Sequence, residues 1–268
     1  MNEKGPDDVA MKTYSSASLY PKAYTDVVQE SKAKREQYRD IVAFLPIPVE
    51  GQELLILEPG MGPSSKLKDA IVHQGLPVGS YKIFGIDKFR PMMDPRFPTV
   101  EGSATDLPFA ANTFDAVILS SVLLYITNRE RAVEECFRVL KPGGKLIMTE
   151  LDVEITADIL IKRVFAYEFK KTWEEIKNND EIKGLAKFSH YASYMYKRIS
   201  TVLPSIKIAS AINKAAVQGS TGTEGFNKEQ LIEYLDNAGF DDGTSIARTY
   251  ADSYYLICAT KQNLETES

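Results

Sequence analysis

The sequence has few of the residues that build disulfide frameworks and metal centres. Its 268 residues include two cysteines, Cys136 and Cys258, and two histidines, His73 and His190. The cysteines lie far apart, in apolar surroundings and outside any metal-ligand spacing, so we expect both to be core residues. His73 falls within a predicted helix and is also expected to be structural. We therefore predict neither a disulfide scaffold nor a bound metal.

Long apolar runs and runs of positive charge are also missing. No segment approaches the roughly 18 uninterrupted apolar residues of a membrane-spanning helix, and the opening residues MNEKGPDDVAMK lack the apolar region of a signal peptide. No run of five or more Lys and Arg occurs, and the formal net charge is −5. We expect a cytoplasmic protein without a membrane span, whose main partner is not a nucleic acid.

What the sequence does contain is an alternation of short apolar runs with helix-like segments. The apolar runs are LLILE (54–58), KIFGID (82–87), FDAVILSS (114–121) and KLIMTEL (145–151). Nearly continuous apolar strands separated by helices predict a parallel sheet that is covered on both faces. Thr127 and Glu130 resemble a capping box for the helix that follows them, and Gly143 and Gly144 are expected to follow that helix.

Two helical regions flank this pattern or interrupt it. Apolar residues at helical spacing predict a helix over 21–45, stopped by prolines, and further helices occupy 155 to about 225. The sheet pattern then resumes with a helix capped by Asn227 and Gln230 and with two strand-like runs, 244–250 and 253–261, which could be antiparallel neighbours. The predicted units are a flexible N-terminus (1–15), a cap helix (16–48), a core (49–153 and 226–268) and a helical insertion (154–225).

The stretch ELLILEPGMGPSS (53–65) combines a strand with a glycine turn. Such a turn places a ligand at the carboxyl edge of a sheet, where Gly60 and Gly62 would let the backbone approach it closely. Together with Ser65, the two glycines nearly fit the GxGxxG pattern of nicotinamide and flavin sites. Against that reading, the Glu58 carboxylate would repel a pyrophosphate, and it suits a cationic ligand group better. The turn alone leaves both ligand classes open.

Four segments in order resemble the class I S-adenosylmethionine-dependent methyltransferases. They are ILEPGMG, FGID, EGSATDLPFAANTFDAVILS and VLKPGGKLIMTE. The resemblance runs from about 53 to 152 and again from 227 to 261. It implies an α/β fold, with a Rossmann-like, seven-stranded and mostly parallel sheet, helices on both faces, N-terminal helices and a helical lid insertion. It also implies S-adenosyl-L-methionine as the cofactor.

The resemblance assigns cofactor contacts by position. Glu58 would contact the amino group of the methionine moiety, with Gly60 and Gly62 beneath it. Asp87 would accept hydrogen bonds from both ribose hydroxyls, because an ionised carboxylate offers two oxygens. The further positions are Lys88, Ser103, Ala104 and Ser120. This chain departs from the family where Ser103 replaces the usual Asp, and where Leu124 and Tyr125 occupy positions at which many relatives have histidine.

Methyl transfer needs an aligned nucleophile, and it needs a base only if the acceptor must lose a proton. The candidate catalytic residues are His190, Glu150, Asp152 and Tyr24, and each has a plain structural alternative. The carboxylates of Glu150 and Asp152 are expected to open into the site after the fifth strand. The candidate substrate-binding residues are Tyr20, Tyr125, Tyr191 and Tyr194, whose aromatic rings could equally be packing.

We expect a SAM-dependent methyltransferase that acts on O, N or C of a small organic acceptor, such as a specialised or secondary metabolite. The two flanking helical regions occupy the places where the family usually covers its active site, although the insertion could equally form a homodimer surface. One alternative is an enzyme that uses SAM for other chemistry, such as a cyclisation. Another is a SAM-binding interaction subunit whose insertion holds a partner.

Overall fold

A computed structural model describes residues 31–62, 66–88, 97–155, 157–197, 199, 225–241 and 243–262. Several predicted features fall outside these ranges. They are Tyr20 and Tyr24, the first part of the predicted cap helix, Ser65 in the glycine turn and the end of the insertion.

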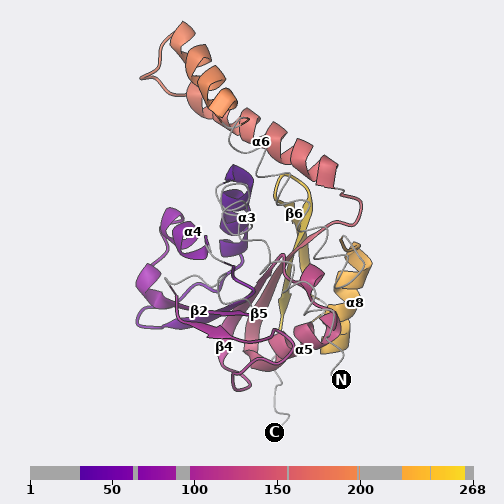
Figure 1. Cartoon of the computed structure of the whole chain (residues 1–268). Helices are drawn as coiled ribbons and strands as arrows, with labels where there is room; N and C mark the ends of the chain where they lie inside the picture. Colours follow the sequence, from indigo (N-terminus) through magenta and orange to yellow (C-terminus); the bar gives the residue numbers. More distant parts are fainter. Residues whose placement is uncertain are drawn as a thin grey trace.

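The core is one seven-stranded sheet with the order β3-β2-β1-β4-β5-β7-β6 (Figure 1). The strands are β1 (Leu54–Pro59), β2 (Tyr81–Asp87), β3 (Thr99–Glu101), β4 (Phe114–Ser120), β5 (Leu140–Leu151), β6 (Ser245–Thr249) and β7 (Tyr254–Thr260). β1 pairs in parallel with β2 and β4, whereas β7 is antiparallel to both β5 and β6. The strand order reverses between β1 and β4, which makes their carboxyl ends the expected place for a ligand. The predicted α/β fold is confirmed.

Helices cover both faces of the sheet. On one face, α3 (Lys32–Val42) and α4 (Leu67–His73) contribute Ile41 and Ile71 to an apolar cluster with Ile56 of β1. On the other face, α5 (Arg129–Val139) and α8 (Lys228–Ala238) share a second cluster, which includes Cys136 and Leu231. Both cysteines are buried as free thiols, as predicted.

α3 is the described part of the predicted cap helix. It begins after Ser31, whose hydroxyl accepts a hydrogen bond from the Lys34 amide at 3.0 Å, as an N-cap residue does. It ends at Val42, before Pro46. Its buried face includes the polar residues Lys34, Gln37 and Tyr38. A surface helix usually buries an apolar stripe, so these buried polar groups indicate polar contacts between α3 and the sheet beneath it.

The start of α5 differs from the predicted capping box of Thr127 and Glu130, which is wrong by one residue. The N-cap is Asn128, whose side chain accepts a hydrogen bond from the Arg131 amide at 3.1 Å. Asn is among the strongest N-cap residues, so it takes that position ahead of Thr. β5 also starts earlier than predicted, directly after α5, and an irregular register lets its Lys141–Gly144 segment stand outside the pairing with β4.

The end of the chain folds as its local pattern predicts. Asn227 and Gln230 form a reciprocal capping box at the start of α8, and Gly239 ends the helix with a left-handed φ of 91°. β6 and β7 form an antiparallel pair joined by a turn at 250–252, where three residues in succession have positive φ. This pair closes one edge of the sheet beside β5.

The insertion contributes α6 (Ala157–Lys177) and a second helical stretch over 185–197. Figure 1 shows α6 running away from the sheet, with the second stretch folded back along it. The rings of Trp173 and Tyr191 join the two helices edge to face, with centroids 5.2 Å apart. The carboxylate of Glu168 on α6 accepts hydrogen bonds from the backbone amide of Lys32, at the start of α3, and from the hydroxyl of Tyr194. Among the helices within the described ranges, none is both long and apolar enough to cross a bilayer.

Candidate functional site

The glycine turn follows β1 at the point where the strand order reverses. Gly60 and Gly62 have φ values of 65° and 67°, a region that L-residues with side chains rarely adopt. A β-carbon on Gly60 would lie 2.7 Å from Val122 Cγ2, so the turn approaches the segment after β4 too closely for any other residue. The Gly60 amide donates to the Ile86 carbonyl at 2.6 Å, which fixes the turn against β2.

The last polar residue of β1, Glu58, has a fully buried side chain. The hydroxyl of Tyr38, on α3, donates a hydrogen bond to Glu58 Oε1 over 2.5 Å. A buried carboxylate is costly unless it is hydrogen-bonded or paired with a cation. Glu58 therefore places a stabilised negative charge directly before the glycine turn.

Lys34 brings a positive charge to the same region from α3. Its side chain is buried, and its Nζ donates to Ser120 Oγ, at the end of β4, over 3.2 Å. Burial lowers the pKa of Lys34 to about 8, while the charges of Glu58 and Glu150 act in the opposite direction. The ammonium therefore lies at the end of β4, where the charges of Glu58 and Glu150 influence it.

Glu150, near the end of β5, is buried and holds the chain segment after β4. Its Oε1 accepts hydrogen bonds from the amides of Val122 and Leu123, both at 3.0 Å. Its Oε2 has no hydrogen-bond partner within the described part of the chain. Burial raises the pKa of Glu150 to about 8, against the lowering effect of these amides and of Arg129 and Lys34. Glu150 Oε2 is therefore available for a further hydrogen bond.

Gln37 is a second buried polar group whose hydrogen bonds are not made. Its side chain is fully buried on α3, and among the described residues neither its amide nitrogen nor its amide oxygen has a partner. Buried polar atoms are almost always hydrogen-bonded, so this unpaired amide has room for a partner such as a ligand or water. The Gln37 amide and Glu150 Oε2 are thus buried polar groups that could still form hydrogen bonds with a ligand.

Asp87 ends β2, next to the glycine turn. It is half-buried and lies in register with Glu101 of β3, and its carbonyl accepts from the Gly102 amide at 3.0 Å. The next residue, Lys88, is exposed. Since Pro59 is the register partner of Ile86, Asp87 and the turn at Gly60 occupy the same edge of the sheet.

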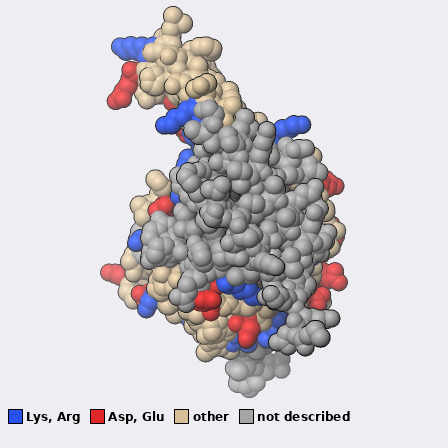
Figure 2. Space-filling view, in the orientation of Figure 1, with Lys and Arg blue, Asp and Glu red and all other residues tan. Residues whose placement is uncertain are grey.

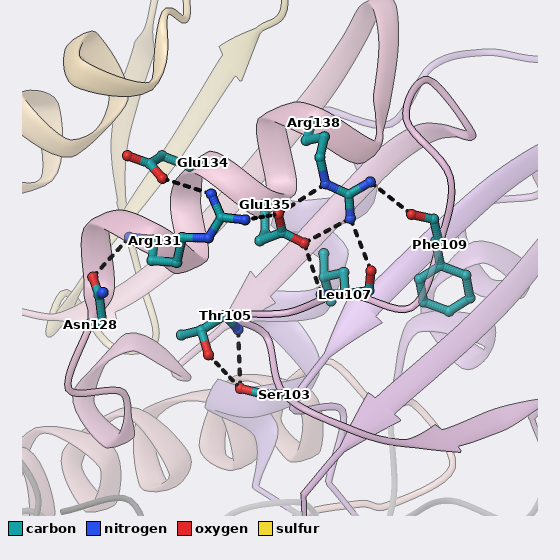
Figure 3. Close-up of polar contacts among 9 residues, drawn as sticks. All are labelled: Ser103, Thr105, Leu107, Phe109, Asn128, Arg131, Glu134, Glu135 and Arg138. Atoms are coloured by element: carbon teal, nitrogen blue, oxygen red, sulfur yellow. Dashed lines mark hydrogen bonds and ion pairs between the residues drawn. The ribbon is translucent and has the colours of Figure 1, made fainter. Parts of the chain in front are cut away.

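The loop after β3 is fixed to α5 by one buried carboxylate (Figure 3). Glu135 accepts a hydrogen bond from the Leu107 amide at 2.8 Å and pairs with Arg138 at 2.7 Å and with Arg131 at 2.6 Å. Arg138 also donates to the carbonyls of Leu107 and Phe109 at 2.9 and 2.8 Å. The hydrogen bonds from Arg138 hold the pKa of Glu135 below its usual range. This cluster gives the loop a defined position.

Ser103 and Ala104 lie at the start of that loop. Ser103 Oγ is 2.7 Å from Thr105 Oγ1 and accepts a hydrogen bond from the Thr105 amide at 3.1 Å, as Figure 3 shows. The Ser103 hydroxyl therefore already takes part in a local turn, and it retains limited capacity for a ligand. Ala104 packs against the apolar cluster beneath α5.

The two remaining candidate bases have different surroundings. Asp152 pairs with Arg248 of β6 at 2.8 Å and accepts from the Glu154 amide at 2.9 Å. These contacts outweigh burial and lower the pKa of Asp152, so its carboxylate serves an ion pair in this structure. His190 is exposed on the second helical stretch of the insertion, with Nδ1 3.2 Å from the Ala186 carbonyl on the same helix.

The described tyrosine candidates fall into two groups. Tyr125 is half-buried in a short 3-10 turn (Leu123–Tyr125) directly after the end of β4. Tyr191 and Tyr194 belong to the insertion, where they contact Trp173 and Glu168 of α6. Tyr125 thus belongs to the same short turn as Leu123, which Glu150 holds. Tyr191 and Tyr194 instead join the helices of the insertion.

Sequence reasoning did not single out Lys34, Gln37 or Tyr38 as site residues. The available signal was their spacing, because positions 34, 37, 38 and 41 share one face of a helix. A lysine and a glutamine within an otherwise apolar face are unusual enough to mark a buried polar site.

Within the ranges that the structure describes, no group of three or more His, Cys, Asp and Glu side chains could hold a metal ion. On the described surface that Figure 2 shows, positive and negative side chains are interspersed, and neither sign gathers into a patch.

Known proteins match the part of the chain that carries the glycine turn. Residues 57–148 match the family described as "Methyltransferase domain". A demethylmenaquinone methyltransferase of Renibacterium salmoninarum is 34% identical over 149 residues, which are 55% of this chain and 60% of that protein. A ubiquinone/menaquinone biosynthesis C-methyltransferase of Pasteurella multocida is 41% identical over 85 residues, or 31% of each chain. The match to these relatives thus leaves a substantial part of their own length uncovered.

Two solved structures share the fold over nearly the whole chain. A SAM-dependent methyltransferase of Thermotoga maritima has a TM-score of 0.52 and 15% identity, covering 96% of this chain and 100% of its own. One from Aquifex aeolicus has a TM-score of 0.51 and 12% identity, covering 94% of this chain and 98% of its own. Residues 57–148 thus match a methyltransferase domain, and the strand order and the glycine turn belong to a Rossmann-like methyltransferase fold, which implies S-adenosylmethionine as the cofactor.

Proposed function

We propose that this protein transfers a methyl group from S-adenosylmethionine to a small organic acceptor. The observation that carries this proposal is the glycine turn at Gly60, which lies directly after the buried Glu58 at the point where the strand order reverses. The turn permits close approach of a ligand, and the carboxylate favours a cationic group over a pyrophosphate. The nicotinamide alternative loses support for the same reason.

The residues present fit this cofactor. The turn at Gly60 packs so closely on Val122 that a β-carbon would lie 2.7 Å from it, and the buried atoms of Gln37 and Glu150 Oε2 have no partner among the described residues. In our proposal, Glu58 binds the methionyl ammonium and Asp87 binds the ribose hydroxyls. Further contacts come from Gly62, Lys88, Ser103, Ala104 and Ser120.

The chain's own contribution to the reaction is mainly alignment and exclusion of water. When bound, S-adenosylmethionine supplies an electrophilic methyl group that the acceptor atom takes by in-line displacement. Orientation of two reactants in one site contributes about 7–11 kcal/mol of barrier reduction. The turn after β4, which Glu150 fixes through the amides of Val122 and Leu123, supplies a rigid wall for that alignment.

A second and narrower proposal concerns the acceptor atom. The relatives named as demethylmenaquinone and ubiquinone/menaquinone C-methyltransferases favour a carbon acceptor in a quinol-type ring. A carbon acceptor must lose its proton, which requires a base. We assign this role to Glu150, because its Oε2 is unpartnered in the described structure and burial raises its pKa to about 8. Asp152 is less suited, since its carboxylate pairs with Arg248.

We further propose that residues 16–48 and 154–225 cover the acceptor, with Tyr125, Tyr191 and Tyr194 as its aromatic contacts. The hydrogen bond between the α3 amide and Glu168 of α6 supports this arrangement, because it joins the two segments at one point. Tyr20, Tyr24 and His190 stay candidates for the acceptor side. Other SAM-dependent chemistry and a role as a SAM-binding interaction subunit are the alternatives.

Calorimetry with S-adenosylhomocysteine, NAD and NADP tests the cofactor. Binding of the thioether in the micromolar range with no binding of either nicotinamide is the expected result, and the reverse pattern would overturn the proposal. Turnover of labelled methyl from S-adenosylmethionine is then measured with a demethylmenaquinone analogue and with a metabolite extract. Cofactor binding without transfer to any component would favour the interaction subunit, and release of an unmethylated, cyclised product would favour other chemistry.

A further inference from the structure

We infer that Lys34 binds the α-carboxylate of the cofactor's methionyl group and that the Gln37 amide donates a second hydrogen bond to the same carboxylate. This inference rests on the proposed function. It assigns a task to α3, whose residues lie outside the segment that matches the methyltransferase domain at 57–148.

The first support is the state of the Lys34 ammonium. It is buried, yet its hydrogen bond goes to the neutral hydroxyl of Ser120, 3.2 Å away. The rings of Tyr38 and Tyr250 lie within cation–π range, at 5.1 and 6.0 Å from its nitrogen. An ammonium carries three donors, so a hydroxyl and two ring faces leave it able to bind an anion.

The second support is Gln37, one helical turn further along the same buried face. Both polar atoms of its side chain are buried and without a partner in the described structure. Its N–H groups can donate to a carboxylate oxygen, and its carbonyl can accept from an ammonium. An amide whose donor and acceptor are both unpaired suits an amino acid, which carries an ammonium and a carboxylate on the same carbon.

The third support is the position of these groups relative to Glu58. Tyr38, adjacent to Gln37, donates a hydrogen bond from its hydroxyl to Glu58 at 2.5 Å, and the Lys34 nitrogen lies 5.1 Å from the ring of the same Tyr38. The anion that would hold the methionyl ammonium and the cation that would hold the methionyl carboxylate therefore lie beside each other. A single helix thus completes recognition of a zwitterion.

The local charges also require a cation here. Glu58 and Glu150 are both buried at the carboxyl ends of their strands. The Glu58 carboxylate would repel a ligand carboxylate, because like charges in a poorly solvated site interact strongly, and Glu150, whose pKa is raised to about 8, offers no compensating positive charge. Lys34 supplies the compensating positive charge.

The test compares two ligands on three proteins by calorimetry. The ligands are S-adenosylhomocysteine and its decarboxylated analogue, which keeps the amino group but lacks the carboxylate. The proteins are the wild type, Lys34→Met and the matched control Lys32→Met, whose lysine pairs with Glu175 of α6 rather than with the site. Wild type and Lys32→Met should bind S-adenosylhomocysteine about 10- to 100-fold more tightly than the analogue. In Lys34→Met this ratio should fall several-fold, because only the Gln37 amide would still bind the carboxylate.

Equal weakening of both ligands by Lys34→Met, or tighter binding of S-adenosylhomocysteine, would overturn the assignment. Failure of the proposed function looks different, because the wild type would then bind neither ligand. Should Lys34→Met fail to fold, as judged by circular dichroism, two measurements still decide. Equal affinity of the wild type for both ligands overturns the assignment, and Gln37→Met must lower the ratio if the amide contacts the carboxylate.

Discussion

The hydroxyl of Tyr38 lies 2.5 Å from Glu58 Oε1 and joins α3 to the end of the central strand β1. Tyr38→Phe removes this donor and leaves a buried carboxylate with one fewer hydrogen bond. Since hydrogen bonds to charged groups contribute about 1.5–3 kcal/mol, we expect a loss of that order in the free energy of unfolding, measured by urea denaturation. Tyr196→Phe, at an exposed position, is the control and should change little. An equal loss in both variants would contradict the assignment.

Asp87→Ala should weaken binding of S-adenosylhomocysteine without unfolding the protein. The proposed carboxylate contacts to the ribose predict a loss of about 1.5–3 kcal/mol in binding free energy. Calorimetry measures it directly, with Asp236→Ala on the exposed surface of α8 as the control. Unchanged affinity in Asp87→Ala would remove Asp87 from the site.

Gly60→Ala should destabilise the protein more than Gly51→Ala. Both glycines have positive φ, at 65° and 78°, so alanine at either position carries left-handed strain of about 1–2 kcal/mol. Only at Gly60 would the new β-carbon meet Val122, at 2.7 Å, whereas nothing lies within 4 Å at Gly51. Crowding should add about 1–3 kcal/mol at Gly60, again measured by denaturant unfolding. Equal losses would show that the turn relaxes away from Val122.

Glu150→Gln should change how stability depends on pH. The folded pKa of Glu150, about 8, lies above its ordinary value of 4.5, so the folded state retains a proton that the unfolded state releases. This group therefore lowers the free energy of unfolding as pH rises from about 4.5 to about 8, by at most about 1.4 kcal/mol per pH unit. Above that window its contribution is constant.

The measurement is the difference in unfolding free energy between wild type and Glu150→Gln, determined from pH 4 to 9. Glutamine does not titrate, so the variant should gain stability relative to wild type across the window. Lys34 has the opposite effect, because its pKa is lowered to about 8 in the folded state. As pH rises from about 8 to 10.5, the folded state has lost this proton while the unfolded state still binds it, so the free energy of unfolding increases. A difference that stays flat between pH 4.5 and 8 would mean that Glu150 is ionised in the folded protein.

Arg138→Met should be more damaging than Arg131→Met, although both arginines pair with Glu135. Arg138 also holds the carbonyls of Leu107 and Phe109, and its loss frees the loop that carries Ser103. We expect a loss of about 1.5–3 kcal/mol for Arg138→Met and under about 1 kcal/mol for Arg131→Met, which is nearly half exposed. Thermal and urea unfolding check the order, and a reversed order would contradict this account of the loop.

Features fixed by neighbouring residues were predictable from the sequence. The apolar runs gave β1, β2 and β4, and the Asn227–Gln230 capping box lies where its spacing predicts. Where two adjacent residues competed for one role, as Thr127 and Asn128 did at the start of α5, the pattern was off by one. The early start of β5 depends on pairing between Leu140 and Phe114, which no local pattern encodes.

The candidate site was predictable on the sheet but not on the helix above it. Glu58, Gly60 and Asp87 follow from strand ends and a glycine turn, because parallel strands bring their carboxyl ends to one edge. Lys34 and Gln37 read as ordinary polar residues of a surface helix, since the sequence does not show which layer α3 covers. Their burial is a tertiary property, set by the packing of α3 across the sheet.

Glu168 has a practical consequence for anyone who trims this chain. Its carboxylate occupies the amino-terminal end of α3 by accepting from the Lys32 amide, and it also accepts from Tyr194. A minimal protein made by deleting the insertion would keep every strand of the sheet, yet it would lose the acidic group that satisfies the first turn of α3. The insertion is therefore part of the scaffold that orients α3, and a shortened version should be expected to fray at the helix that carries Lys34.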